Sequence, residues 1–338
     1  WCSVVRWEKT TRPFLRSVEF HWQEGHTIHE TAEEAMKETK QMLEVYANFC
    51  KEYLAIPVIK GRKTESEKFA GAEITYTIEA LMHDGKALQS GTSHYFGNGF
   101  AKAFNISFQN RNNEQEYVYQ TSWGSSTRLI GGIIMTHGDN RGLVLPPAVA
   151  PIQVIIVPVA MHKPGVIEKA EEILNTLNSV CRVQIDKSDK SPGWKFSEYE
   201  MRGVPLRLEL GPRDIQNNEC VIVRRDNLEK IKVSLDSLED TVVKLLQDVH
   251  EGMYQKALER RQSMTYTAQN EKEFEKIAQE KIGLIKAPWC GSAECEKTIK
   301  EKTAFTSRCI IEGTPSEGSR CLCCGNKPKY VVYWAKAY

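Results

Sequence analysis

Two extended segments open the chain, and each alternates apolar with polar positions. Residues 4–8 place valine and tryptophan opposite arginine and glutamate, so the two kinds of side chain lie on opposite faces of a strand. The segment from Phe14 to His26 has five charged or aromatic residues at even spacing, which predicts one shared face: Arg16, Phe20, Trp22, Glu24 and His26. This face suits an anionic ligand with a flat ring and an amine, because arginine binds phosphate oxygens and aromatic rings cover bases.

The rest of the first 150 residues predicts strands paired by hairpins and flanked by helices. Thr31–Glu34 is a capping box, and apolar residues at helical spacing follow it. Extended segments are expected at 56–59, 74–82, 86–95 and 117–123, with Asp84-Gly85 as a hairpin turn. A helix of small residues follows from Ser126 to His137. We therefore predict an antiparallel α+β domain over residues 1–150.

The pattern changes at Pro151 to strands that alternate with helices. Strands are expected at 153–159, 182–186, 205–210 and 219–224, and helices at about 165–180 and near 196–202. This order predicts a largely parallel α/β domain over residues 151–258, ended by an amphipathic helix that Ser237 and Asp240 cap. Residues 259–338 are expected to form a small third domain of the α/β class.

Composition narrows the possible partners. The 338 residues carry a formal net charge of only +1, so nucleic acid must be bound by local patches and not by a bulk positive field. No run of about twenty apolar residues predicts a membrane span. We expect a cytoplasmic protein without a secretory signal. Because Trp1 leads directly into a strand, we also expect the chain to lack its N-terminal part.

Six of the ten cysteines lie in the last fifty residues and suggest a metal site. Cys290 and Cys295 form one close pair, and Cys321 and Cys324 form a second. Two such pairs can hold tetrahedral zinc, and four sulfur ligands leave no open position, so the zinc would be structural. Cys323 competes with Cys324 as the fourth ligand, and free cysteines or disulfides are the alternatives.

Two further segments combine residues that suit ligand binding. Residues 89–97 mix hydroxyl, amide and imidazole groups with glycine, which fits either a binding strand or an ordinary glycine-rich strand end. Arg128 lies in the first turn of a helix, where a cation opposes the helix dipole and calls for an anionic partner. Farther on, Trp194, Lys195 and Arg207 combine rings and cations as single-stranded RNA sites do, although an ordinary α/β domain also explains them.

Taken together, the segments resemble the prolyl-tRNA synthetases, a family of class II aminoacyl-tRNA synthetases, in their eukaryotic and archaeal type. The resemblance covers nearly the whole chain. It rests on ordered matches that include residues 4–8, 14–26, 68–71, 91–94, 127–128, 137–140, 145–147, 192–196 and 211–214. It implies a class II antiparallel catalytic core, an anticodon-binding domain and a C-terminal zinc-binding domain.

The resemblance also implies a role for individual residues. Arg6 and Arg128 would be catalytic and would bind the phosphates of ATP. The other nucleotide contacts would come from Glu8, Arg16, Phe20, Gln89 and Thr92. Arg6 would also contact proline, whose pocket would be completed by Trp22, Glu24, His26, Phe69, His94, Trp123 and Ser125. Glu200, Arg207 and Lys195 would contact the tRNA anticodon, and the terminal Tyr338 would pack near the active site.

The implied reaction joins L-proline to tRNA(Pro) with ATP and Mg²⁺, in a homodimer that also holds structural Zn²⁺. The family's motif 1 and its Thr-x-Glu proline loop are expected before Trp1, so the chain alone should be inactive. No editing insertion separates motif 2, which would contain Arg6, from motif 3, which would contain Arg128, so no hydrolysis of alanyl-tRNA is expected. The alternative is a catalytically inactive, synthetase-like protein that binds tRNA or regulates, but retention of the binding residues argues against it.

Overall fold

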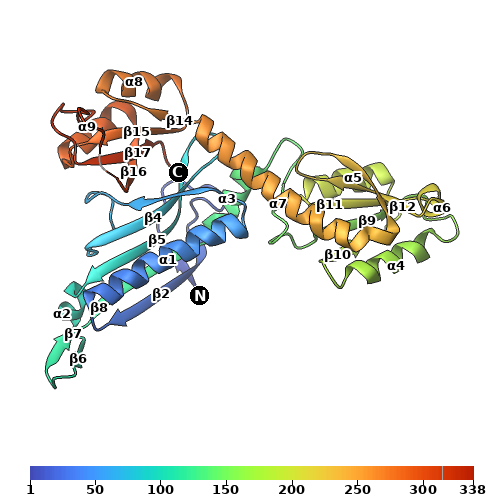
Figure 1. The fold of residues 1–338 in the computed structure, drawn as a ribbon, viewed down its shortest axis with the longest axis horizontal. Coiled ribbons are helices and arrows are strands. Elements are labelled where there is room, and N and C mark those ends of the chain that lie inside the picture. Colours follow the sequence, from blue (N-terminus) through green and yellow to red (C-terminus); the bar gives the residue numbers. More distant parts are fainter. Residues whose placement is uncertain (314) are drawn as a thin grey trace. The chain divides into compact units, whose positions relative to one another are not determined.

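The structure, a computed structural model, describes residues 1–313 and 315–338 and divides them into two units (Figure 1). The first unit comprises Trp1–Lys51, Pro57–Thr136 and Glu259–Tyr338. The second comprises Glu52–Ile56 and His137–Leu258. The boundary at Leu258 falls within one long helix, α7 (Leu238–Ser263). The three domains predicted from the sequence stay a prediction beside this division.

A ten-stranded sheet organises the first unit, in the order β1-β2-β8-β5-β4-β3-β16-β17-β15-β14. Its strands are β1 (Cys2–Val5), β2 (Glu19–His29), β3 (Val58–Arg62), β4 (Ile74–Leu81), β5 (Ala87–Gly97), β8 (Tyr119–Ser126), β14 (Thr265–Thr267), β15 (Leu284–Trp289), β16 (Thr306–Ile311) and β17 (Tyr330–Ala335). Every neighbouring pair is antiparallel except β14 and β15. The predicted antiparallel fold is thus confirmed, and the sheet continues into the C-terminal strands.

Helices and one small hairpin complete the first unit. They are α1 (Ala32–Glu52), α2 (Gly99–Phe104), the hairpin β6 (Ser107–Gln109) with β7 (Gln115–Tyr117), α3 (Arg128–His137), α8 (Glu271–Glu280) and α9 (Ala293–Thr303). The backbone N–H of Glu34 donates to Thr31 Oγ1 at 3.2 Å, so the predicted start of α1 is confirmed.

Helix α1 covers one face of the sheet (Figure 1). Leu43 and Cys50 are buried on the inner side of the helix. Tyr46 donates its hydroxyl hydrogen bond to Gln23 Oε1 at 2.6 Å, and Ser93 Oγ donates to the carbonyl oxygen of Thr39 at 2.7 Å. Because strand residues alternate between faces, residues next to these on β2 and β5 point to the opposite side of the sheet.

The structure corrects the extent of the second predicted strand. β2 begins only at Glu19, and Arg16 lies in the preceding loop, where its backbone pairs with Arg12. Pro13 fixes its own φ, and Phe14 takes a φ of 59°, so the chain turns before the strand starts. Arg16 therefore does not share the strand face with the four residues that follow it at even spacing.

The second unit contains a five-stranded sheet in the order β10-β9-β11-β12-β13. Its elements are β9 (Val154–Pro158), α4 (Val166–Leu177), β10 (Val183–Ile185), α5 (Pro192–Met201), β11 (Leu206–Leu210), α6 (Pro212–Gln216), β12 (Glu219–Arg224), β13 (Lys230–Ser234), the 3₁₀ turn η1 (Leu235–Ser237) and the first part of α7. Strands β10, β9 and β11 are parallel, as predicted, whereas β12 and β13 return antiparallel.

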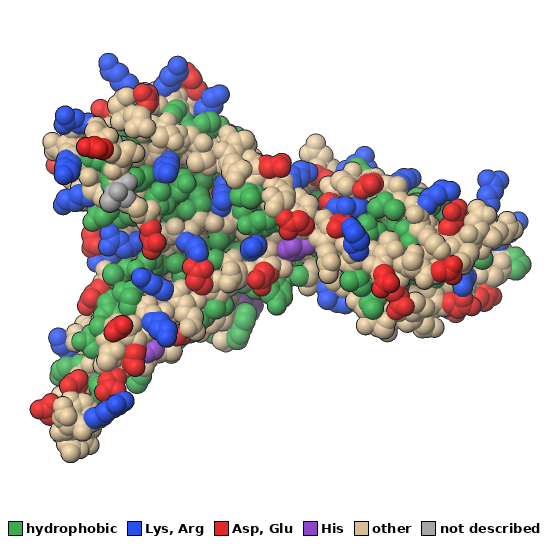
Figure 2. Space-filling model, in the orientation of Figure 1, with side chains coloured by type: hydrophobic (Ala, Val, Ile, Leu, Met, Phe, Trp, Pro, Cys, Tyr) green, Lys and Arg blue, Asp and Glu red, His purple; other side chains and the backbone are tan. Residues whose placement is uncertain are grey.

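Charged side chains of both signs alternate over the visible surface of each unit (Figure 2). This mixture agrees with the net charge of +1. Within the described residues, the structure contains no helix with the length and apolarity needed to cross a membrane.

Candidate functional site

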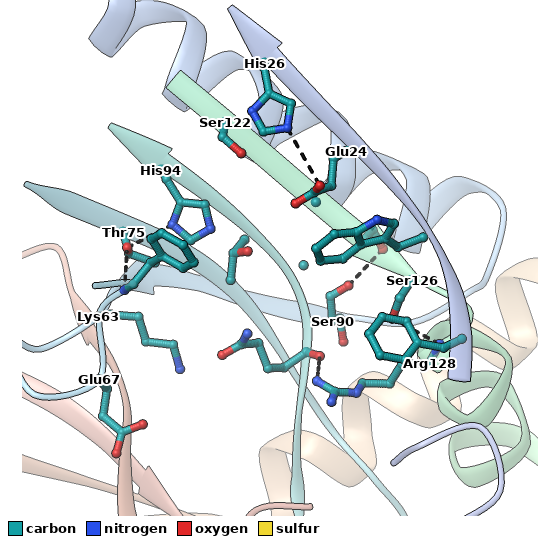
Figure 3. Close-up of a pocket in the computed structure, with 18 of the residues that line it drawn as sticks. Glu24, His26, Lys63, Glu67, Thr75, Ser90, His94, Ser122, Ser126 and Arg128 are labelled. Atoms are coloured by element: carbon teal, nitrogen blue, oxygen red, sulfur yellow. Dashed lines mark hydrogen bonds and ion pairs between the residues drawn. The ribbon is translucent and has the colours of Figure 1, made fainter. Parts of the chain in front are cut away.

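A cavity of about 370 Å³ opens on the face of the first sheet opposite α1 (Figure 3). Eleven of the residues predicted to bind nucleotide or proline line it: Arg6, Phe20, Trp22, Glu24, His26, Phe69, Gln89, Thr92, His94, Ser125 and Arg128. They come from segments more than 120 residues apart in sequence. The predicted convergence on one cavity is therefore confirmed as geometry, while their individual roles stay predictions.

Strand β2 supplies one wall of this cavity through its even positions. Phe20, Trp22, Glu24 and His26 all line the cavity, whereas Gln23 faces α1. The predicted shared face of these four residues is thus confirmed. His26 Nε2 lies 3.7 Å from Glu24 Oε2, so the carboxylate stands at the cavity edge beside an imidazole (Figure 3).

Two arginines reach the cavity, and no described carboxylate pairs with either of them. Arg6 lies 5.4 Å from the ring centre of Phe20 and 5.2 Å from that of Trp22, which are cation–π contacts. Arg128 donates from Nε to the carbonyl oxygen of Leu15 at 3.0 Å and from Nη1 to that of Gln89 at 3.5 Å. Burial, and then the positive charge of Arg16, lowers the pKa of Arg128. Such a site favours an anionic ligand, which would relieve that repulsion.

An aromatic group forms the opposite end of the cavity. Phe69 lies 5.1 Å from His94 between ring centres, and Phe96 stacks 5.9 Å from His94. His94 Nδ1 is 2.9 Å from Thr75 Oγ1, which fixes the imidazole (Figure 3). Burial lowers the pKa of His94 to about 4, so the ring is neutral at physiological pH. The phenyl groups suit a small apolar ligand. Because the neutral imidazole does not repel a cation, this ligand can also carry a positive charge.

Glu8 and Arg16 lie outside this cavity, beside a second one of about 350 Å³. Arg16 Nη1 donates to Glu8 Oε2 at 3.3 Å, and Arg16 Nη2 donates to the backbone oxygen of Tyr338 at 3.2 Å. The Tyr338 hydroxyl donates to Asp84 Oδ2 at 2.5 Å. Tyr338 thus contacts a residue predicted to bind nucleotide, in agreement with its predicted position near the active site.

Trp123 is not among the residues that line the cavity. It is buried, and its ring fills the space above Gly25, where an added Cβ would come within 2.1 Å of the indole. A side chain at position 25 would therefore displace this ring. The predicted place of Trp123 in a proline pocket becomes one of support from within the sheet.

Sequence reasoning missed Lys63 and Glu67, which also line the cavity (Figure 3). Both precede the Lys68–Gly71 segment, and Lys63 follows directly on β3. Their segment has no strand-like alternation, and only the long-range pairing of β3 with β4 brings it to the cavity. The cluster of charged residues from Lys60 to Lys68 was the one sequence feature that could have indicated a binding segment here.

The four predicted zinc ligands lie together in the first unit. Cys290 follows β15, Cys295 lies on α9, and Cys321 and Cys324 belong to one loop; their sulfur atoms all lie within 4.8 Å of one another. Cys290 Sγ is 3.7 Å from Cys295 Sγ and 3.8 Å from Cys324 Sγ. Tetrahedral zinc with bonds of about 2.3 Å would separate its sulfurs by about 3.8 Å. The cluster, which does not include Cys323, therefore fits zinc.

The predicted anticodon residues form a network inside the second unit. Arg207 Nη1 donates to Glu200 Oε1 at 3.0 Å, Arg207 Nε donates to Glu209 Oε1 at 3.0 Å, and the guanidinium lies 4.2 Å from the ring centre of Phe196. Arg207 is 6 % exposed. Its charge is therefore balanced by carboxylates of the same unit.

Lys195 is placed differently from the RNA-contacting position predicted for it. Its side chain is 1 % exposed, and Nζ donates to the carbonyl oxygen of Asp186 at 2.9 Å. The inner face of α5 carries it into the unit, whereas the adjacent Trp194 is about half exposed. Lys195 thus holds the start of α5 from inside.

Comparisons with known families agree with this geometry. A model of the tRNA synthetase class II core domain (G, H, P, S and T) matches residues 1–137. The anticodon binding domain matches residues 153–245, and the C-terminal domain of prolyl-tRNA synthetase matches residues 271–338. The chain thus has the domain set of a class II aminoacyl-tRNA synthetase.

Individual relatives narrow the class further. The proline–tRNA ligase of Ruminiclostridium cellulolyticum is 62 % identical and that of Clostridium novyi 61 %, each over all 338 residues and 71 % of the relative. Proline–tRNA ligase 2 of Bacillus cereus (strain ZK / E33L) is 59 % identical over the same shares. The chain belongs to the prolyl-tRNA synthetase family.

Proposed function

We propose that this chain, in its full-length protein, activates L-proline with ATP and transfers the prolyl group to the 3′ end of tRNA(Pro). One observation supports this proposal most strongly. Arg6 and Arg128 line the same cavity without a described carboxylate partner, and they lie there near acidic and aromatic side chains. This arrangement offers positive charge to phosphates beside a small pocket for an imino acid.

The nucleotide occupies the end of the cavity that holds the two arginines. Arg6 binds the α-phosphate, and Phe20 covers the adenine ring. Gln89 and Thr92 contact the nucleotide from β5, on the face that also carries the arginine contacts. Glu8 accepts a hydrogen bond from the amino group of adenine. Arg16 and Arg128 together bind the terminal phosphates. Glu8 and Arg16 bond to each other in the neighbouring cavity. When ATP binds, it must therefore break this ion pair or lengthen it.

Proline occupies the end that holds Phe69 and His94. Glu24 accepts the substrate ammonium, and His26 fixes Glu24 from 3.7 Å. Trp22, Phe69 and the neutral His94 enclose the ring, with Ser125 at the boundary to the nucleotide and Trp123 behind the strand. Arg6 also contacts the proline carboxylate.

The chemistry is in-line displacement at phosphorus, followed by acyl transfer. A proline carboxylate oxygen forms a bond to the α-phosphorus, and the bond to the bridging oxygen of pyrophosphate breaks. A terminal ribose hydroxyl of the tRNA then attacks the prolyl carbonyl carbon and releases AMP. Arg6 and Arg128 stabilise the charge that develops on the phosphates, and Mg²⁺ supplies further neutralisation when bound with ATP.

The second unit contributes the anticodon contacts. Glu200, near the end of α5, and Arg207, on β11, face the bases together, since each holds the other in place. The exposed Trp194, with Lys190 Nζ 5.9 Å from its ring centre, offers a surface on which a base can stack. Lys195 supports this surface from the interior.

Further features of the assembly are proposed with the function. The cysteine cluster holds one structural Zn²⁺, the full-length protein forms a homodimer, and it acts in the cytoplasm, where tRNA serves translation. The eukaryotic and archaeal type stays our proposal beside bacterial relatives, supported by the C-terminal domain and the short connection between motifs 2 and 3. That motif 1 and a Thr-x-Glu loop precede Trp1, and that alanyl-tRNA is not edited, also stay predictions.

The zinc proposal has its own test. Replacement of Cys324 by serine weakens a ligand and should lower the zinc content of the purified protein from about one atom per chain to well below half. Atomic absorption measures this content, and Cys323→Ser is the control that should retain the metal. Equal retention by both variants would contradict the assignment.

The function itself is tested by ATP–pyrophosphate exchange with the full-length protein. We expect exchange that depends on proline, followed by charging of tRNA(Pro) in the presence of tRNA. Exchange that is absent, or that prefers another amino acid, would refute the proposal. Absence of exchange with retained tRNA binding would favour a non-catalytic synthetase-like protein.

A further inference from the structure

Three buried charged residues join the C-terminal strands to the strands of the cavity. Lys63 Nζ donates to Glu79 Oε1 at 2.8 Å and to the carbonyl oxygen of Arg308 at 2.9 Å. Arg308 donates from Nε and Nη2 to Glu79 Oε2 at 3.1 and 2.9 Å. The side chains of Lys63 and Glu79 are 2 % exposed and that of Arg308 is 8 % exposed. The three residues, called here the buried triad, come from the end of β3, from β4 and from β16.

The buried triad carries two positive charges and one negative charge. Burial alone would raise the pKa of Glu79, but the charges and hydrogen bonds of Lys63 and Arg308 lower it overall, so the carboxylate is ionised. The triad therefore has a net charge of +1. Without Arg308 the net charge would be zero.

This charge lies at the wall of the nucleotide end of the cavity. Lys63 is part of the cavity wall, on the side that carries Glu67 (Figure 3). Glu79 is paired across the sheet with Gln89, which also lines the cavity, and the negative charge of Glu79 acts on Arg128. Glu79 alone would thus oppose a ligand that carries phosphates, and the two cations reverse its sign.

We propose that Arg308 is a positioning residue for nucleotide binding: it holds and neutralises Glu79, so that Lys63 presents net positive charge to the cavity. Arg308 itself touches no reacting atom. The inference rests on the proposed function of the cavity and adds that the C-terminal domain contributes electrostatically to the affinity for ATP. Such a contribution acts at short range through a dry interior, where charges are weakly screened.

A second buried contact fixes the same corner of the cavity. Thr64, next to Lys63, donates from Oγ1 to Glu296 Oε1 at 2.8 Å, and Ser307 Oγ bonds the same carboxylate oxygen. Glu296 follows the cysteine ligand Cys295 on α9, and Ser307 precedes Arg308 on β16. Residues 63 and 64 are therefore held by the carbonyl oxygen of Arg308 and the hydroxyl of Ser307, which are successive residues of one C-terminal strand, and by the helix of the cysteine cluster.

A charge cycle on the full-length protein tests the proposal through KM for ATP in proline-dependent exchange. Arg308→Gln lowers the net charge of the triad to zero and should raise KM for ATP about tenfold. The double variant Glu79→Gln/Arg308→Gln restores +1 and should return KM to within about threefold of wild type. Glu79→Gln alone gives +2 and should not raise KM. KM for proline, a zwitterion, should change less than about threefold throughout.

Some variants lose a buried partner and can fail to fold, so one pair carries the test alone. Arg308→Gln keeps the buried pair of Lys63 and Glu79, and Arg308→Lys keeps the charge at position 308 as well, so KM for ATP should be higher in Arg308→Gln than in Arg308→Lys. Lys302→Gln is the matched control, because it removes an exposed cation from the same domain and should leave both KM values within about twofold.

Two outcomes would overturn the proposal. KM for ATP could rise equally in all three triad variants, as a purely structural role predicts, or it could change in none. Both results presuppose exchange by the wild-type protein. Failure of the wild-type protein to exchange would instead refute the proposed function, so the two failures are distinguishable.

Discussion

Two arginines of the cavity and two of the second unit have opposite surroundings. Arg128 donates to two carbonyl oxygens, and Arg6 lies against two aromatic rings; neither forms a salt bridge with a described carboxylate. In the second unit, Arg207 bonds Glu200 and Glu209, and Arg225 bonds both oxygens of Asp139 at 2.7 and 2.8 Å.

This difference separates arginines that are suited to bind an anionic ligand from arginines whose ion pairs stabilise the folded protein. The half-buried guanidinium of Arg128, which has no carboxylate partner, is stabilised by an anion, whereas a paired guanidinium gains little from a new anion. The residue type alone does not distinguish the two cases. Only the partners do, and these come from distant parts of the sequence.

The largest expected effect follows from replacing a cavity arginine. Arg128→Gln should lower kcat/KM for proline-dependent exchange by about 10²- to 10³-fold, because it removes a charge that stabilises the phosphates. The free energy of unfolding should change by only about 1 kcal/mol, since two hydrogen bonds to carbonyls are lost. Calorimetry and exchange kinetics measure the two quantities. A large loss of stability with normal exchange would reverse the comparison.

Replacing a paired arginine should give the opposite pattern. Arg225→Gln breaks the bidentate contact with Asp139 and should lower the free energy of unfolding by about 2 kcal/mol. Exchange, which needs no tRNA, should stay within about twofold of wild type. Urea unfolding monitored by circular dichroism supplies the first value. Arg202→Gln, which removes an exposed pair with Glu198, is the control with little effect.

The same pair predicts a dependence of stability on pH. The hydrogen bonds from Arg225 lower the pKa of Asp139 to about 2, below its ordinary value of 3.8. The pair therefore stabilises the fold fully above about pH 4, and this contribution is lost as pH falls toward about 2. Between pH 5 and 3, Asp139→Asn should lose less stability than the wild type. An equal loss in both proteins would show that another group dominates.

The smallest expected effect concerns His94, which should not change its protonation near neutral pH. Burial lowers the pKa of His94 to about 4, so this ring does not change its charge between pH 5.5 and 8. KM for proline in this range should have the same pH dependence in wild type and in His94→Gln, even if its absolute value shifts. A transition near pH 6.5 that disappears in the variant would contradict the neutral state of His94.

The local parts of the site could be predicted from the sequence. The alternation from Phe20 to His26 correctly placed four side chains on one face, because strand geometry depends on neighbouring residues alone. The cysteine spacing predicted which four sulfur atoms lie close together in the structure. The resemblance to a known family added Gln89, Thr92 and Arg128, which no local pattern would assign to the same cavity.

Long-range features could not be predicted in the same way. The buried triad joins residues up to 245 positions apart, and Lys63 becomes part of the cavity wall only through the pairing of β3 with β4 and β16. Arg16 was misplaced because Pro13 and Phe14 delay the start of β2. Lys195 turned inward because the faces of a short helix are set by its packing and not by its composition.

The most direct test is a crystal structure of the full-length protein with a non-hydrolysable analogue of prolyl-adenylate. We expect the analogue in the cavity of the first unit, with Arg6 within about 3.2 Å of an oxygen at its phosphate position, the adenine against Phe20 and the proline ring near Phe69 and His94. An analogue bound elsewhere, or bound here with Arg6 and Arg128 turned away from it, would contradict the account.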